Sequence, residues 1–246
     1  MYPDSSLTAS QKQVFQDAAA RWAQVITAAL PSEAGRLPSG GSVTTSGATI
    51  EASSVAMDGV GKILGSAGPY ALRHSDRLTL TGQMQFDSAD MANMEQTGML
   101  KNVILHEMGH VLGIGTLWED HGLLSFNGSS CTDSSTTRIS YTGAHANAQF
   151  KALGGSGAVP VETNYGEGTK CGHWSEAALK TELMTGFASK GSTPLSKITV
   201  GTLEDLGYTV NYAAADAYTL PLAGAAVPQQ PDGVMLRPTP YVVPGH

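Results

Sequence analysis

The segment His106-Glu107-Met108-Gly109-His110 places two metal-ligating side chains and one carboxylate within five residues. On a helix, a step of four residues brings both imidazoles onto one face, about one turn apart. Zinc prefers imidazole nitrogen as a ligand, and a catalytic zinc site keeps one position open for water. Glu107 would lie beside that position, where its carboxylate could accept a proton from the water and pass it to a departing amine. The segment therefore predicts zinc-dependent peptide hydrolysis, against the alternative that these side chains share a helix by chance.

Two histidines do not complete a zinc shell, so a third protein ligand must come from elsewhere in the chain. The remaining histidines are His74, His121, His145, His173 and His246. In the compact pattern H-E-x-x-H-x-x-G-x-x-H, the glycine allows a sharp turn that returns a histidine to the metal. Gly113 holds the glycine position, but position 116 is threonine. The third ligand is then a displaced histidine or a glutamate from another helix, and Gly113 favours the displaced histidine.

Apolar spacing predicts three helices that could position these groups. From Thr8 to Leu30, apolar residues recur at three- and four-residue steps, with Ser10 and Gln13 spaced as a capping box. A second helix, from about Glu95 to Leu112, should carry the histidine motif. A third helix is expected from Ser196 to Leu206, with its apolar residues facing inward.

Strands and irregular segments are expected between and after these helices. Gly40 to Ala52 and Arg77 to Phe86 carry β-branched and apolar residues between turn residues, which predicts strands. Residues 115–172 are rich in Gly, Ser, Thr and Asn and weakly periodic, as in an insertion ordered by local contacts. The tail from Pro221 onward contains six of the chain's 12 prolines, so we expect it to be extended rather than helical or a central strand.

Composition narrows the classes of function and partner. The 246 residues are 41% hydrophobic, enough to bury one large core, and carry 14 Lys and Arg against 21 Asp and Glu. A net charge of -7 without a dense basic cluster argues against nucleic acid and anionic membranes as partners. Because apolar runs fall short of the roughly 20 residues that span a bilayer, no integral membrane segment is expected. The start, MYPDSSLTAS, lacks the features of a secretory signal, so we expect any signal or pro-segment to have been removed or never to have been part of this chain.

The chain has two cysteines, Cys131 and Cys171, which flank a segment rich in Gly, Ser, Thr and Asn. If bridged, they would close a loop of about 40 residues and stabilise the fold by roughly 4 kcal/mol in the chain-entropy model. The alternative is two free buried thiols. We favour the disulfide.

The chain resembles the leishmanolysin family of surface metallopeptidases, in which a long insertion separates the third zinc histidine from the H-E-x-x-H helix. The core of the likeness lies in HEMGHVLGIGTLW (106–118) and HWSEAALKTELMTG (173–186). Bacterial members are also similar through MDGVGKILGSAGP (57–69), GQMQFDSAD (82–90) and LSKITVGTLEDLGYTVNY (195–212). The likeness covers roughly residues 8 to 220.

The resemblance implies a role for two residues after the insertion. His173 would be the third zinc ligand beside the two motif histidines, and Met184 would form a turn under the metal. His121 and His145 remain alternatives for the third ligand. Met184 could instead be an ordinary core residue, since methionine fills gaps anywhere.

The resemblance further implies an α+β metzincin architecture, with a twisted mixed sheet and the active-site helix in the N-terminal half, and a loop-rich, helical C-terminal half. The strand around Leu78 to Phe86 is the candidate for the upper rim of a cleft between the halves, where an extended peptide could pair. A strand is expected before the first helix, but only about seven residues precede Thr8, so the sheet should lack that strand or borrow one. The expected organisation is a catalytic domain at 1–220 (upper subdomain 1–113, lower subdomain 114–220 with the insertion at about 115–172) and a Pro-rich tail at 221–246.

We therefore predict a monomeric, secreted or cell-surface zinc endopeptidase that acts on polypeptides, with Glu107 as general base. An alternative from another class is a binding or adhesion module that keeps the scaffold and its zinc but lacks turnover. A third hypothesis is a zinc hydrolase that acts on non-peptide amides or esters. Side-chain preference does not follow from the sequence, because the segment at about 185–193 and the insertion are Gly- and Ser-rich.

Overall fold

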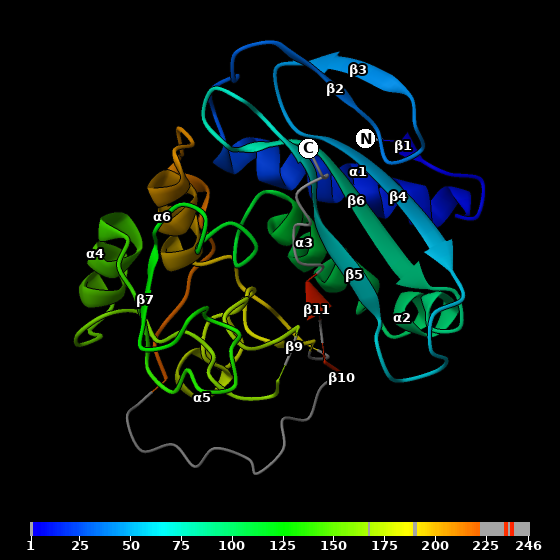
Figure 1. Ribbon diagram of the computed structural model, residues 1–246. Coiled ribbons are helices and arrows are strands. Elements are labelled where there is room, and N and C mark those ends of the chain that lie inside the picture. The colour runs from blue at the N-terminus through cyan, green and yellow to red at the C-terminus, as the bar shows by residue number, and fades with distance from the viewer. Residues whose placement is uncertain (1, 167, 189–190, 222–233, 236, 239–246) are drawn as a thin grey trace.

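The computed structural model describes residues 2–166, 168–188, 191–221, 234–235 and 237–238. Figure 1 shows a β-sheet with helices α1 and α3 beneath it, and a loop-rich part with short helices below them. The described residues thus form a mixed α/β fold with six α-helices. None of the helices in the described ranges is long and apolar enough to cross a membrane.

The main sheet is mixed, and its strands follow the order β1-β4-β6-β5-β11. β6 pairs parallel with β4 on one side and antiparallel with β5 on the other. Both edges of β6 are therefore occupied, and the expectation that Leu78 to Phe86 forms the rim of a cleft is wrong. The strands are β1 (Tyr2–Pro3), β4 (Thr49–Val55), β5 (Gly65–Leu72), β6 (Thr79–Asp87) and β11 (Arg237–Pro238).

The strand before the first helix is present, in contrast to the expectation that the sheet lacks or borrows it. β1 contributes only two residues, Tyr2 and Pro3, which pair parallel with Glu51 and Ala52 of β4. Three two-stranded sheets complete the strand pairs: β2 (Glu33–Arg36) with β3 (Ser42–Thr45), β7 (Leu124–Phe126) with β8 (Ile139–Tyr141), and β9 (Phe187–Ala188) with β10 (Val234–Met235).

Helix α1 (Ala9–Val25) is shorter than the sequence pattern predicts and is capped differently. The capping box is formed by Thr8 and Gln11, because Thr8 has the extended backbone of a cap, while Ser10 lies within the first turn. At the other end, Ile26 leaves the helix and pairs as an isolated bridge with Val210. The helix therefore ends at a long-range contact, which no local periodicity encodes.

The predicted second helix is divided in two. α2 (Met91–Gln96) ends at Thr97 and Gly98, and α3 (Leu100–Val111) begins after them. Gly98 has a φ of +74°, a left-handed conformation that closes a helix. All residues of α3 from 103 to 111 are buried, which fixes this helix on every side.

The lower part contains α4 (Ala144–Ala152), α5 (Glu176–Leu179) and α6 (Lys197–Leu206), followed by a 3-10 turn at Tyr212–Ala214. α6 confirms the third predicted helix, and the Ser196 side chain caps it. The predicted disulfide is also confirmed, with Cys131 and Cys171 bridged 40 residues apart. The insertion is ordered by this bridge together with the β7–β8 hairpin and α4.

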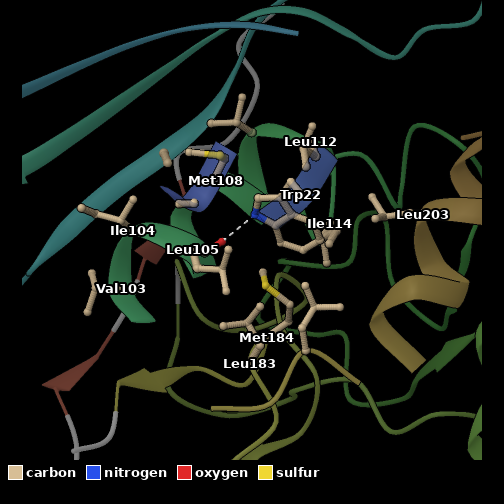
Figure 2. Packing of buried hydrophobic residues seen from close by; sticks show 14 of the residues in the cluster. Trp22, Val103, Ile104, Leu105, Met108, Leu112, Ile114, Leu183, Met184 and Leu203 are labelled. Atoms are coloured by element: carbon tan, nitrogen blue, oxygen red, sulfur yellow. Dashed lines mark hydrogen bonds between the residues drawn. The ribbon is translucent and has the colours of Figure 1, made fainter. Parts of the chain in front are cut away.

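The hydrophobic core joins the two parts around α3. Figure 2 shows Trp22 of α1 against Leu105 and Met108 of α3, with Met184 approaching from below. The Trp22 indole nitrogen donates a hydrogen bond to the Leu105 carbonyl oxygen at 3.1 Å. These buried contacts position α3 with respect to both α1 and the chain after the insertion. The rest of the Pro-rich tail, at 222–233, 236 and 239–246, lies outside the described residues.

Candidate metal centre

Three histidines from two distant segments come together in the interior. His106 and His110 lie one turn apart on α3, and His173 lies after the insertion. Their Nε2 atoms are separated by 2.8 Å (106 to 110), 3.1 Å (110 to 173) and 3.2 Å (106 to 173). Within the described ranges, these three residues form the one group of His, Cys, Asp or Glu side chains close enough to hold a metal ion.

The other candidate histidines lie elsewhere. His145 faces Glu204 at 3.0 Å with a half-exposed side chain, and His74 is almost fully exposed near Glu33. His121 contacts the Arg77 carbonyl oxygen at 3.4 Å. His246 lies outside the described residues. The structure therefore brings His173, rather than His121 or His145, to the two motif histidines.

Each of the three clustered rings has its Nδ1 atom at a backbone carbonyl oxygen. The distances are 2.6 Å from His106 to Leu183, 2.8 Å from His110 to Ile114, and 3.0 Å from His173 to Thr169. A carbonyl oxygen only accepts hydrogen bonds, so Nδ1 must be the protonated nitrogen of each neutral ring. All three Nε2 atoms then present a lone pair to a common point.

Burial keeps these rings neutral. It lowers the pKa of His106 to about 3, lowers that of His173 to about 4, and holds that of His110 well below its usual range. Three converging lone pairs without a proton between them repel one another, and a cation at their common point would remove that repulsion. Neutral imidazole nitrogens in this number are what a catalytic zinc site uses, so the donor set fits a metal ion.

Glu107 lies next to this cluster on α3 and is fully buried. Neither of its carboxylate oxygens has a hydrogen-bond partner among the described residues. Burial raises the pKa of this carboxyl well above its usual range. An unpartnered buried carboxyl group is costly to the fold, and on the same helix as two of the three converging imidazoles it indicates a functional site.

The backbone around His173 is held by a close contact between two glycines. Gly115 has a φ of +78°, and a Cβ atom there would lie 1.9 Å from the Gly172 carbonyl oxygen. Cys171, two residues before His173, is anchored to Cys131 by the disulfide. Gly113, with a φ of +106°, turns the chain after α3 so that the Ile114 carbonyl oxygen reaches His110.

Met184 lies in a turn below α3. The Thr185 amide donates to the Glu182 carbonyl oxygen at 3.2 Å, which closes this turn, and Leu183 supplies the carbonyl that orients His106. A Cβ atom on Gly109 would lie 2.8 Å from the Met184 sulfur, so the glycine within the histidine motif leaves room for Met184.

Sequence reasoning missed Glu182, which supports the turn below the metal site. Its buried carboxylate accepts hydrogen bonds from the Met184 amide (2.7 Å), the Ser196 amide (3.1 Å) and hydroxyl (2.7 Å), and the Thr199 hydroxyl (2.6 Å). It thereby ties the Met184 turn to the start of α6. The available signal was a lone acidic residue directly before the apolar pair Leu183-Met184.

Comparison with known families agrees with this geometry. A family model described as leishmanolysin matches residues 56–226, more than two thirds of the chain. The matched region includes all three clustered histidines, Glu107 and both cysteines. No curated protein matches the chain.

Proposed function

The chain belongs to the leishmanolysin family of peptidases, and from this premise we propose that it is a zinc endopeptidase with a metzincin-type arrangement of its two parts. The observation that carries the proposal is the convergence of three neutral histidine nitrogens, together with the unpartnered, buried side chain of Glu107 on the same helix as two of them. The polypeptide substrate follows from the peptidase family.

In this proposal His106, His110 and His173 hold the ion through their Nε2 atoms. When bound, zinc would supply Lewis-acid chemistry that polarises a peptide carbonyl and increases the acidity of water. The carbonyl oxygens of Leu183, Ile114 and Thr169 keep the three rings in the tautomer and orientation that this role requires.

Glu107 acts as the general base. Its carboxylate accepts a proton from the attacking water and then donates that proton to the departing amine nitrogen. Since no hydrogen bond from the described residues occupies either oxygen, both remain available for these transfers. We assign no further oxyanion donor, because Gly186, at the second position after Met184, has no side chain to supply one.

We also propose the wider organisation that the family suggests: a catalytic domain at 1–220 whose halves, 1–113 and 114–220, face each other across a substrate cleft, followed by the tail at 221–246. The protein would be monomeric and secreted or displayed at the cell surface. The Cys131–Cys171 disulfide supports export, because disulfides persist in oxidising compartments.

A zinc-containing binding module without turnover is the second candidate. The observation that favours it is burial: Glu107, His110 and His173 have no exposed surface, and His106 has 1%. A substrate must reach Glu107 before it can be hydrolysed. Hydrolysis of an unfolded protein substrate by the zinc-loaded protein separates the two candidates.

The test compares zinc-loaded wild type with Glu107→Gln on unfolded casein. We expect hydrolysis by the wild type, its loss on chelation, and at least a hundredfold slower turnover in Glu107→Gln, on the order of the contribution of a general base. The variant should retain about one zinc per chain by elemental analysis. Glu119→Gln, a matched change at an exposed position, should behave as wild type. Inactivity of correctly folded, zinc-loaded wild type would favour the binding module, and normal turnover by Glu107→Gln would exclude the mechanism.

A further inference from the structure

The C-terminal segment returns to the middle of the molecule and pairs with two strands that are far apart in sequence. β11 pairs parallel with β5, with Arg237 opposite Ser66 and Pro238 opposite Ala67. β10 pairs antiparallel with β9, with Val234 opposite Ala188 and Met235 opposite Phe187. Figure 1 shows β10 and β11, in red, between β5 of the sheet and β9 of the lower part.

Both partner strands border the metal centre. β9 begins one residue after Gly186, where a Cβ atom would lie 3.8 Å from the His173 ring carbon Cγ. β5 contacts α3, the helix that carries His106, Glu107 and His110. One of its edges pairs with β6 and the other with β11. The C-terminal strands therefore pair with β5, which contacts the helix of the two motif histidines, and with β9, which directly follows the residue beside His173.

A strand edge of this kind binds extended polypeptide by main-chain hydrogen bonds, with little demand on side-chain sequence. β5 is the last long strand on one side of the sheet, and β9 directly follows the turn at Met184. A polypeptide substrate that reached Glu107 would find these two edges available only if β10 and β11 left them. The complete burial of Glu107 agrees with a site that is covered in this state.

We propose that β10 and β11 form an intramolecular inhibitory segment, which occupies the edges of β5 and β9 that an extended substrate would use. The inference rests on the proposed endopeptidase function and adds its regulation. The ligand class that competes for the same edges is unfolded polypeptide, and the segment must release them before substrate binds.

The segment is suited to reversible release. Each of its two strands is only two residues long. β11 pairs with β5 in the parallel direction, and parallel pairing is slightly less stable per residue than antiparallel pairing. A substrate running in the opposite direction would pair antiparallel with β5. Since the segment is covalently attached, its effective concentration is nevertheless high, on the order of millimolar.

Proline substitution tests the pairing in the full-length protein, because proline lacks the amide that a strand pair requires. In Val234→Pro/Met235→Pro, β10 should no longer pair with β9. The matched control, Val242→Pro/Val243→Pro, makes the same change beyond both strands. We expect kcat/KM on a quenched fluorescent peptide to rise about tenfold in the first variant, since the apparent value scales with the fraction of open molecules. The control should equal wild type.

A binding measurement separates failure of this inference from failure of the proposed function. In the Glu107→Gln background, the affinity for fluorescein-labelled casein should rise by a similar factor, about tenfold, in the Val234→Pro/Met235→Pro variant and not in the control. If no variant hydrolyses peptide but this difference in affinity persists, the competition between the segment and polypeptide for the two strand edges stands, while the endopeptidase proposal fails. Equal affinities and equal kcat/KM values in the two proline variants would overturn the inference.

A second experiment adds the segment back in trans. A synthetic peptide covering residues 231–241 should inhibit the activated variant, and the same peptide carrying the two prolines should not. Absence of inhibition by the unsubstituted peptide at millimolar concentration would count against the shared edges, because that concentration matches the intramolecular one.

Discussion

Each clustered histidine has one nitrogen committed to a backbone carbonyl and the other directed at its two neighbours. This arrangement decides the chemistry at the scale of single residues, because the tautomer determines where the lone pairs lie. Sequence spacing accounts for His106 and His110, which share a helix face. It does not account for the carbonyl of Leu183, which reaches His106 across 77 residues.

Substitution of His173 should distinguish it from His121 and His145, the other candidates for the third zinc ligand. We predict that His173→Ala lowers zinc affinity by more than about 100-fold. Loss of a residue that only hydrogen-bonds to a metal ligand typically costs about 10- to 100-fold, so a larger loss indicates a direct ligand. His121→Ala and His145→Ala should leave the affinity unchanged, because these side chains lie away from the cluster. Competition with a chromophoric chelator measures all three variants. An equal loss in His121→Ala would contradict the ligand set.

The raised pKa of Glu176 predicts that the stability of the folded protein depends on pH. Burial is the largest cause that raises the pKa of its carboxyl from 4.5 to about 7, and one of its oxygens has no partner. The folded state then binds the proton more tightly than the unfolded state, so the contribution of Glu176 to stability is fully present below pH 4.5 and is lost as the pH rises through about 7.

The variant Glu176→Gln should remove this dependence. At pH 8 its Tm should exceed that of the wild type, because an ionised buried carboxylate has been replaced by a neutral amide, whereas at pH 4 the two should agree closely. Thermal unfolding across this pH range makes the measurement. Asp120→Asn, a change at an exposed carboxylate, serves as control. A Tm difference that did not vary with pH would refute the assignment to Glu176.

At the scale of elements, the contact between Gly115 and Gly172 joins the turn after α3 to the segment that carries His173. The close approach of two backbone segments, rather than side-chain packing, thereby positions the segment that carries His173. Neither glycine stands out in the sequence, because the chain has 29 of them and only the fold brings these two together.

Alanine substitution at Gly115 should reveal the energetic contribution of this contact. Gly122→Ala, where φ is +66° and nothing lies within 4 Å, should cost about 1 kcal/mol of unfolding free energy for the left-handed backbone alone. Gly115→Ala carries the same backbone penalty and also meets the Gly172 carbonyl, so it should cost about 1–3 kcal/mol more and weaken zinc binding. Urea unfolding and zinc titration of the two variants provide the comparison. Equal stability and equal zinc affinity would argue against this contact.

At the scale of the whole molecule, the Cys131–Cys171 disulfide closes a loop of 40 residues that includes α4 and ends beside His173. We predict that Cys131→Ala/Cys171→Ala loses about 4 kcal/mol of unfolding free energy in the chain-entropy model. Urea unfolding of the wild type and the double variant, each with and without a reducing agent, measures the effect. Reduction should destabilise the wild type alone, and a wild type insensitive to reduction despite a broken bridge would contradict the prediction.

The sequence alone determined the features that depend on neighbouring residues. The spacing of the two motif histidines, the third helix, and the apolar faces of α1 and α3 all follow from the helical period, which acts over a few residues. Helix ends were less predictable. Thr8, and not the predicted Ser10, caps the first helix, and Gly98 divides the second helix. Backbone conformation rather than residue type decides where such helices end.

Only the tertiary structure decided the features that join distant segments. It placed His173 beside α3, which residue spacing left open among several histidines and which the family resemblance implied. It enclosed the predicted rim strand between β4 and β5. It also paired the C-terminal strands with β5 and β9. Such pairings depend on main-chain hydrogen bonds and on the free energy of burying the whole core, neither of which leaves a periodic trace in the residues concerned.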